Sequence, residues 1–115
     1  MQGNHEMQVN TEQRDGATIV RPEGDVDLSS SSTLRTSLQE AHESTEGKLI
    51  IDLANVKYMD SSGVATLVEC LQLSRRSGTT LLLCQLHERV LSVFQIARLD
   101  GVFDIVPSLD EALAH

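Results

Sequence analysis

The sequence predicts a small α/β domain, and three observations lead to that prediction. Two short apolar runs, at residues 48–53 and 79–84, have the length and composition of buried strands. Each run is followed by apolar residues at helical spacing, and strands that alternate with helices form parallel pairs. The chain of 115 residues is long enough for one core, which must be aliphatic because only 3% of residues are aromatic. We expect one α/β domain over residues 7–115, with a mixed, mostly parallel sheet of about four or five strands, about four helices and the order β-β-α-β-α-β-α-β-α.

The first part of the chain predicts a β-hairpin. Residues 1–6 are polar, and we expect them to be disordered. Residues 7–13 alternate weakly between apolar and polar, which favours an edge strand. Asp15-Gly16 is a strong turn signal, and residues 17–21 resume an extended pattern. The two extended segments should therefore pair as antiparallel strands.

The first helix is predicted after a run of serines. Leu34, Leu38 and Ala41 share one helical face. Residues 29–32 are all serine and offer several possible N-caps, and Gly47 is a plausible stop signal.

The second helix is predicted to begin after Asp60, to run to about Ser77 and to stop at Gly78. Its apolar face consists of residues at i, i+3, i+4 and i+7: Val64, Leu67, Val68 and Leu71.

The last third of the chain predicts two helices around a short strand. Residues 87–98 have helical periodicity, and residues 102–106 are extended in pattern. A final helix is expected at residues 109–114, because Ser108 and Glu111 before and within it have the spacing of a capping box.

The charge of the chain argues against two classes of partner. With 17 acidic and 9 basic residues, the formal net charge is −8. Nucleic acid and anionic membrane surfaces both attract basic proteins, so neither is expected as a partner. A protein partner with a basic surface is compatible with this charge.

The cysteines and the absence of targeting signals favour a cytoplasmic protein. Cys70 and Cys84 lie in apolar segments and match no metal or redox spacing, so we expect reduced, buried thiols and no metal or cofactor. The first ten residues lack the apolar segment of a signal peptide, and no run is long enough to span a membrane.

The most informative motif is the tetrapeptide Asp60-Ser61-Ser62-Gly63, which stands between a predicted buried strand and a predicted helix. A helix N-terminus offers unpaired backbone N–H groups and the positive end of the helix dipole, which together tolerate a phosphate group. Asp and Ser are also common N-cap residues, and capping serines are more common than regulatory ones, so the motif on its own favours simple capping.

Several stretches together resemble the STAS domain, and within it the bacterial anti-sigma-factor antagonists. The similarity covers about residues 7–114. Residues 22–27 resemble the family segment after the second strand. Residues 49–63 resemble its phosphorylation-site segment, and residues 89–103 resemble its third helix and last strand.

The resemblance implies a binding switch that phosphorylation controls. The unmodified protein would bind an anti-sigma factor, a serine kinase, and so free a sigma factor for transcription. The kinase would phosphorylate Ser61 and end binding, and a PP2C-type phosphatase would restore the protein. The resemblance also places Asp27 at the partner-binding surface. Residues 64–66 replace a family stretch that often contains a second Gly, so we expect an altered contact surface or partner preference.

The expected partner-binding residues are Asp27, Asp60, Ser61, Ser62, Gly63 and Val64, and each except Ser61 has a second interpretation. Asp60 orients Ser61 or simply caps the helix, and both can hold. Ser62 is the weaker phosphate acceptor and is better suited to a backbone hydrogen bond. Gly63 would let a partner or nearby backbone approach. Val64 can serve both partner and core, and Asp27 contacts the partner or is only solvated.

The sequence bears on two other functions. An enzyme is not expected and no catalytic residue is proposed, because no phosphate-binding Gly-rich loop is present and the histidines are remote in sequence from Ser61. The alternative function is a STAS scaffold that is never phosphorylated, as a subunit of a lipid-transport or stress-signalling complex.

Overall fold

The structure, a computed structural model, describes residues 7–115, and a five-stranded mixed sheet organises them. Its strands are β1 (Gln8–Arg14), β2 (Ala17–Glu23), β3 (Lys48–Asp52), β4 (Thr80–Cys84) and β5 (Asp104–Val106). They lie in the order β1-β2-β3-β4-β5, with β1 antiparallel to β2 and the other neighbours parallel. The predicted fold class and order of elements are confirmed. The disorder expected for residues 1–6 lies outside the described residues.

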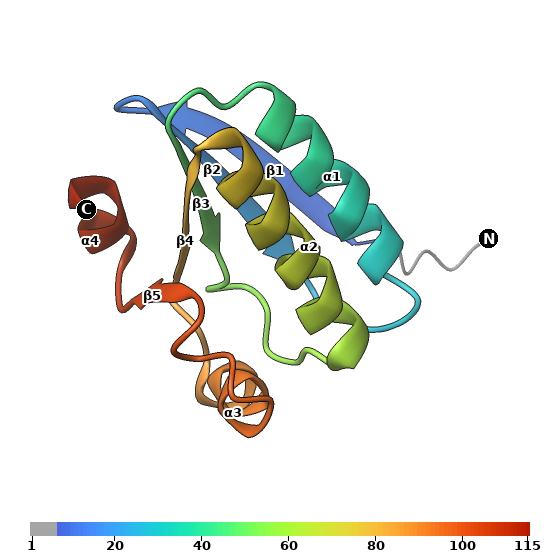
Figure 1. The fold of residues 1–115 in the computed structure, drawn as a ribbon. Coiled ribbons are helices and arrows are strands. Elements are labelled where there is room, and N and C mark those ends of the chain that lie inside the picture. Colours follow the sequence, from blue (N-terminus) through green and yellow to red (C-terminus); the bar gives the residue numbers. More distant parts are fainter. Residues whose placement is uncertain (1–6) are drawn as a thin grey trace.

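The helices of residues 7–115 are α1 (Ser31–Glu43), α2 (Ser61–Ser77), α3 (Glu88–Ile96) and α4 (Leu109–Ala114). Figure 1 shows α1 and α2 side by side over the sheet, with α4 apart from them. Successive side chains of a strand point to opposite faces. Leu49 and Ile51 of β3 therefore pack in the cluster with α1 and α2, whereas Ile50 packs in a second cluster with α4.

The predicted hairpin is present and its turn chemistry is clear. Asp15 and Gly16 have φ of 52° and 79°, so both occupy the left-handed region that a two-residue hairpin turn requires. Arg14 pairs with Ala17 across the turn. β2 continues beyond the expected end through Pro22, which is tolerated because the ladder with β3 has already stopped at Val20.

Two helix ends differ from the sequence prediction. α1 ends at Glu43 and not at Gly47, because the hydroxyl groups of Ser44 and Thr45 both donate hydrogen bonds to the Ala41 carbonyl and close the last turn. Gly47 instead precedes β3, where its carbonyl accepts from the Thr80 N–H. α3 spans Glu88–Ile96 and not residues 87–98.

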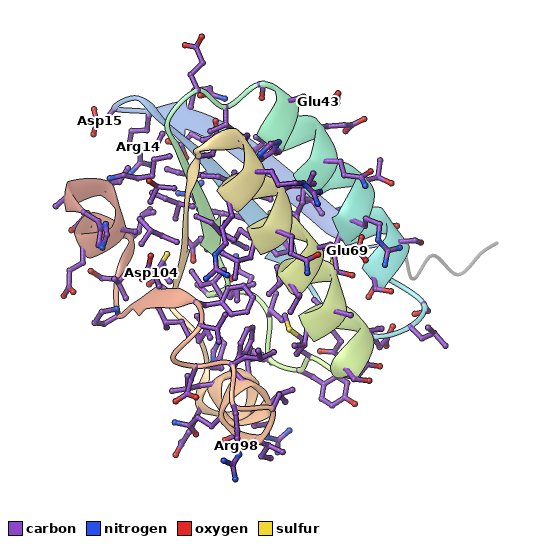
Figure 2. The ribbon with its side chains drawn as sticks, viewed as in Figure 1. Arg14, Asp15, Glu43, Glu69, Arg98 and Asp104 are labelled. Carbon is purple, nitrogen blue, oxygen red and sulfur yellow. The ribbon has the colours of Figure 1, made fainter. Side chains whose placement is uncertain are left out.

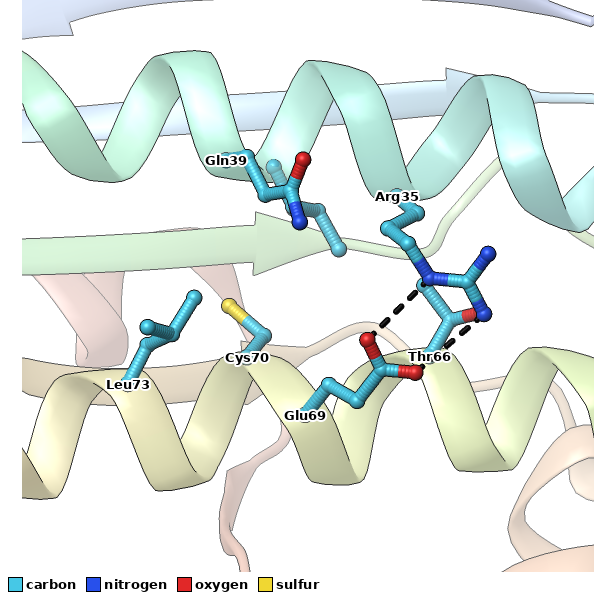
Figure 3. A pocket seen from close by; sticks show the side chains of 7 residues that line it. Arg35, Gln39, Thr66, Glu69, Cys70 and Leu73 are labelled. Carbon is cyan, nitrogen blue, oxygen red and sulfur yellow. Dashed lines mark hydrogen bonds and ion pairs between the residues drawn. The ribbon is translucent and has the colours of Figure 1, made fainter.

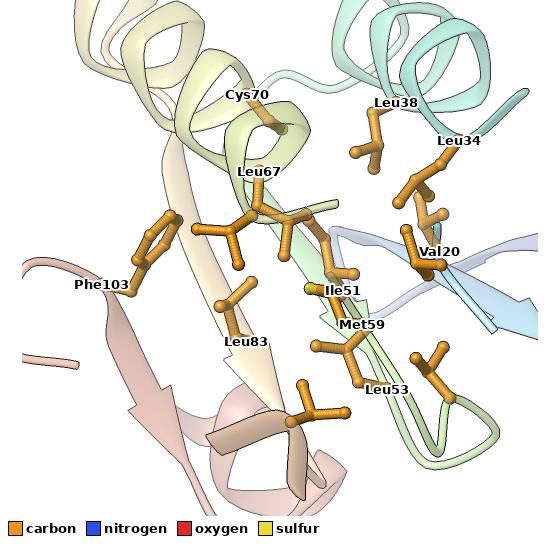
Figure 4. Packing of buried hydrophobic residues seen from close by; sticks show 14 of the residues in the cluster. Val20, Leu34, Leu38, Ile51, Leu53, Met59, Leu67, Cys70, Leu83 and Phe103 are labelled. Atoms are coloured by element: carbon orange, nitrogen blue, oxygen red, sulfur yellow. The ribbon is translucent and has the colours of Figure 1, made fainter. Parts of the chain in front are cut away.

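The core on the α1 and α2 face is largely aliphatic, as predicted (Figure 4). Leu67 of α2 and Leu83 of β4 are completely buried there. The exception is an aromatic pair, Phe94 of α3 and Phe103, whose rings meet edge to face with centroids 5.3 Å apart. This pair fixes α3 against the segment that leads into β5.

Both cysteines are free and buried, as the sequence predicts. Cys70 lies between α1 and α2, where it lines a small pocket with Arg35 and Glu69 (Figure 3). Arg35 Nε donates to Glu69 Oε1 at 3.1 Å across that seam. Burial raises the pKa of Cys70 to about 11 and that of Cys84, on the other face, to about 12. Both thiols are therefore protonated at neutral pH.

Candidate partner-binding site at the start of α2

Two loops come together at the N-terminus of α2. The loop after β2 and the loop after β3 are joined by a short parallel bridge between Val26 and Met59. The Val26 N–H donates to the Tyr58 carbonyl, and the Asp60 N–H donates to the Val26 carbonyl, both at 2.9 Å. This bridge places Asp27 and Asp60 on neighbouring strands of backbone, although 33 residues separate them in the sequence.

Asp60 is the N-cap of α2, as its capping interpretation predicts. Its Oδ1 accepts from the backbone N–H of Ser62 at 2.9 Å and from that of Gly63 at 3.4 Å. The Ser62 hydroxyl also donates to Oδ1, at 2.6 Å. These hydrogen bonds, above all that of the Ser62 hydroxyl, lower the pKa of Asp60 from its ordinary value. A negative charge is therefore fixed at the positive end of the helix dipole.

Ser61 and Ser62 differ although they are adjacent. Ser61 is the first residue of α2 and is exposed. Among residues 7–115 its hydroxyl has no hydrogen-bond partner, whereas the Ser62 hydroxyl is engaged by Asp60. The geometry therefore leaves Ser61 as the accessible hydroxyl of the motif.

Gly63 and Val64 are both buried, and Gly63 has an internal reason to be glycine. A Cβ at residue 63 would lie 2.6 Å from Met59 Cγ and 2.6 Å from Val26 Cγ1, which is closer than atoms can approach. Close packing of the two joined loops against α2 therefore demands a residue without a side chain. Val64 is 7% exposed and contributes to the core as well as to the surface groove described below.

Asp27 organises the loop that leads to α1. Its Oδ1 accepts from the Ser29 hydroxyl at 2.6 Å and from the Ser29 N–H at 2.9 Å. These bonds, led by that of the Ser29 hydroxyl, lower the pKa of Asp27. The carboxylate is half-buried and ionised, and Leu28 beside it is 81% exposed. An unusually exposed leucine and a fixed negative charge thus lie at the same edge of the molecule.

An apolar groove of about 420 Å³ runs beside Ser61 between α2 and α3. Sequence reasoning missed the contribution of α3 to this surface. The signal was present in the sequence, because Val93 and Ala97 stand at i, i+4 spacing within the helix predicted at residues 87–98. The groove is lined by Ser61, Val64, Ala65, Val68, Glu69, Val93, Ala97 and Leu99.

The side chains of His42 and His87 are engaged by groups other than Ser61. His42 Nε2 lies 2.9 Å from the hydroxyl of Ser77, at the opposite end of α2. His87 Nε2 lies 2.7 Å from the carbonyl of Ala54. Within the described part of the chain, no three His, Cys, Asp or Glu side chains gather in a way that could hold a metal ion. Over the same residues, no helix has the length and apolar character needed to cross a membrane.

Comparison with known proteins defines the family. A sequence profile of the STAS domain matches residues 8–112, and the chain belongs to this family. It is 32% identical over 97 residues to the anti-sigma-B factor antagonist of Bacillus subtilis, covering 84% of this chain and 88% of that protein. It is 27% identical over 105 residues to the anti-sigma F factor antagonist of Paenibacillus polymyxa, with coverage of 90% and 87%.

Solved structures show the same fold. An anti-sigma factor antagonist from Mycobacterium paratuberculosis superposes with a TM-score of 0.82 at 23% identity, covering 94% of this chain and 92% of that one. The Bacillus cell fate determinant SpoIIAA in its phosphorylated form superposes with a TM-score of 0.70 at 18% identity, with coverage of 93% and 97%. The fold is therefore the one seen in these two solved proteins.

Proposed function

We propose that this protein is a cytoplasmic, non-enzymatic anti-sigma-factor antagonist that phosphorylation of Ser61 switches off. Its unmodified form binds an anti-sigma factor of the serine kinase type and so frees a sigma factor for transcription. A PP2C-type phosphatase removes the phosphate and restores binding. The observation that carries the proposal is the exposed Ser61 hydroxyl, unengaged among residues 7–115, at the first residue of α2 and beside an apolar groove.

The physical basis of the switch is a change of charge without a change of fold. A phosphate on Ser61 adds a charge of about −1.5 to −2 and three strong acceptor oxygens. The N-terminus of α2 tolerates this charge, so the domain need not unfold. A partner packed over Ser61 and the groove would instead have to bury that charge beside Asp60. Burying it without a counter-ion costs several kcal/mol, which is enough to abolish micromolar binding.

The partner surface proposed here combines polar loops with the apolar groove. Asp27, Asp60, Ser61 and Ser62 form its polar part, and Gly63 holds the two loops close enough to present them together. Val64 joins this part to the groove. Since the chain carries a net charge of −8, a partner whose basic residues lie at the rim of the apolar contact, and not over Ser61, fits this surface.

The first test maps the modification in the cell. The protein is purified from its own host with phosphatases inhibited, and its intact mass is measured for wild type, Ser61→Ala and the matched variant Ser62→Ala. The proposal predicts one added phosphate in wild type and in Ser62→Ala and none in Ser61→Ala. An unmodified Ser61 under growth and stress conditions would instead favour the scaffold function.

The second test measures binding. A kinase-type anti-sigma factor from the same genome is titrated with wild type, with Ser61→Asp and with Ala97→Asp. The Ala97→Asp substitution places a charge in the wall of the groove. Both variants are expected to bind at least about tenfold more weakly. Unchanged affinity of Ser61→Asp would argue strongly against the switch.

A further inference from the structure

The second core cluster of the protein lies under a single short helix. It consists of Ala17, Ile19, Ile50, Leu82 and Cys84 on the sheet and Ala112 on α4, with Val106, Leu109 and Leu113 packed against it. All six of the central residues are buried, and each is at most 2% exposed. Figure 1 shows α4 alone on its side of the molecule, away from α1 and α2. Among the helices of residues 7–115, only α4 supplies side chains to this cluster.

One lysine holds the C-terminal end of α4. Lys48 is the first residue of β3. Its ammonium group reaches three backbone oxygens in the last turn of α4 and just after it. Its Nζ lies 3.0 Å from the Ala112 oxygen, 2.9 Å from the Leu113 oxygen and 2.7 Å from the His115 oxygen. An ammonium has three N–H donors, so all of them are directed to this helix end.

Apart from the packing of its apolar side chains on the sheet, α4 has two polar supports, a cap at its start and Lys48 at its end. It has six residues, far below the roughly 12 that an isolated helix needs in water. Ser108 caps its start by accepting from the Glu111 N–H at 3.1 Å. Its last turn contains no basic residue, so the carbonyl end of the helix receives its positive charge from Lys48 alone among the described residues.

We propose that α4 is a strap latched by Lys48, which opens locally while the rest of the domain stays folded and thereby uncovers an apolar strip of the sheet. Opening uncovers Ile19, Ile50 and Leu82. The first core cluster and the site at Ser61 lie on the opposite face of the sheet and remain intact. The strap is thus a conformational device independent of the proposed phosphorylation switch.

The test compares Lys48→Met with Lys57→Met. The chain contains two lysines, and Lys57 lies exposed in the loop after β3, which makes it a matched control. Methionine keeps the aliphatic stem of Lys48 and removes its three donors. Hydrogen exchange of the α4 amides is expected to be roughly tenfold faster in Lys48→Met than in wild type, with the α2 amides and Lys57→Met unchanged. Equal α4 exchange rates in the two variants would overturn the proposal.

The two cysteines provide a second, independent readout. Cys84 belongs to the cluster under α4, and Cys70 belongs to the other cluster. Lys48→Met should increase the rate at which a maleimide labels Cys84 without changing that of Cys70. Equal acceleration at both thiols would mean global destabilisation and would overturn a separate strap. In wild type, α4 amides that exchange only by global unfolding, together with the β3 and β4 amides, would overturn it as well.

Discussion

Single residues at the start of α2 show how packing and function share one segment. Ser61 is exposed, whereas Gly63, two positions later, is enclosed by Met59 and Val26. Local spacing predicted Asp60 as a possible helix cap, and the resemblance to the STAS family implied Ser61 as the phosphate acceptor. The atoms that exclude a Cβ at residue 63 include those of Val26, which belongs to another loop. A contact between segments 37 residues apart leaves no local signal.

Gly63→Ala is predicted to destabilise the protein. The added methyl would overlap Met59 Cγ and Val26 Cγ1, and overpacking of this kind costs about 1–3 kcal/mol. The better helix propensity of alanine, about 1 kcal/mol, offsets part of that cost. Because the methyl would overlap two buried side chains, its cost should lie near the upper end of that range, and urea unfolding should show a net loss of about 2 kcal/mol in the free energy of unfolding.

Gly47→Ala is the matched control for this prediction, because nothing lies within 4 Å of a Cβ at residue 47. It should change stability by no more than about 0.5 kcal/mol. If Gly63→Ala unfolded at the same urea concentration as Gly47→Ala, the packing explanation for Gly63 would be wrong.

At the scale of elements, the ends of helices were the least predictable features. The end of α2 was predicted correctly because Gly78 adopts the left-handed conformation, with φ of 78°. The end of α3 was missed because Arg98 adopts that conformation in place of a glycine, with φ of 61°. The Leu99 N–H donates to the Phe94 carbonyl at 2.8 Å, and the Arg98 N–H donates to the Gln95 carbonyl at 3.0 Å. These two bonds form a Schellman motif whose usual sequence signal is absent.

Arg98→Gly is therefore predicted to stabilise the protein by about 1 kcal/mol, because glycine adopts a left-handed conformation without the penalty of a Cβ. Arg98 is exposed and its side chain points away from the body of the molecule (Figure 2), so little packing is lost. Thermal unfolding should show a higher midpoint for this variant.

Gly78→Ala offers the opposite change at the end of α2. Alanine would then have to adopt the φ of 78° at this position. The midpoint of thermal unfolding should therefore fall by about as much as it rises in Arg98→Gly. A lower midpoint for Arg98→Gly would mean that the arginine side chain contributes more than its backbone strain costs.

For the whole molecule, the alternation of strands and helices predicted the sheet and its mostly parallel pairing. It did not predict which helices cover which face of the sheet. Which helix covers which face depends on how side chains sort between two clusters. α4 lies on one face and α1 and α2 on the other. The groove beside Ser61 likewise needs Val64 and Val93, on different helices, to meet. Patterns along the chain identified the helices and strands. Surfaces formed by two or more of these elements could be identified only from the structure.

The dependence of stability on pH is a property of the whole molecule. Hydrogen bonds in the folded state lower the pKa of Asp27 and Asp60 from 3.8, led by those of Ser29 and Ser62, and an Arg21 hydrogen bond lowers the pKa of Glu12 from 4.5. A carboxylate with a lowered pKa binds fewer protons when folded than when unfolded. Its contribution to stability is therefore complete above those ordinary values and is lost as the pH falls through the folded values.

The urea midpoint should consequently hold between about pH 7 and pH 5 and fall below about pH 4. Measurements at constant ionic strength separate this fall from screening of the net charge. In the double variant Asp27→Asn with Asp60→Asn, asparagine keeps an acceptor oxygen at each position and cannot titrate, so the fall below pH 4 should be shallower than in wild type. If the two curves fell with equal steepness, the loss of stability would have to arise from other carboxylates, and the hydrogen-bonded aspartates that frame Ser61 would not be the groups through which acid unfolds the protein.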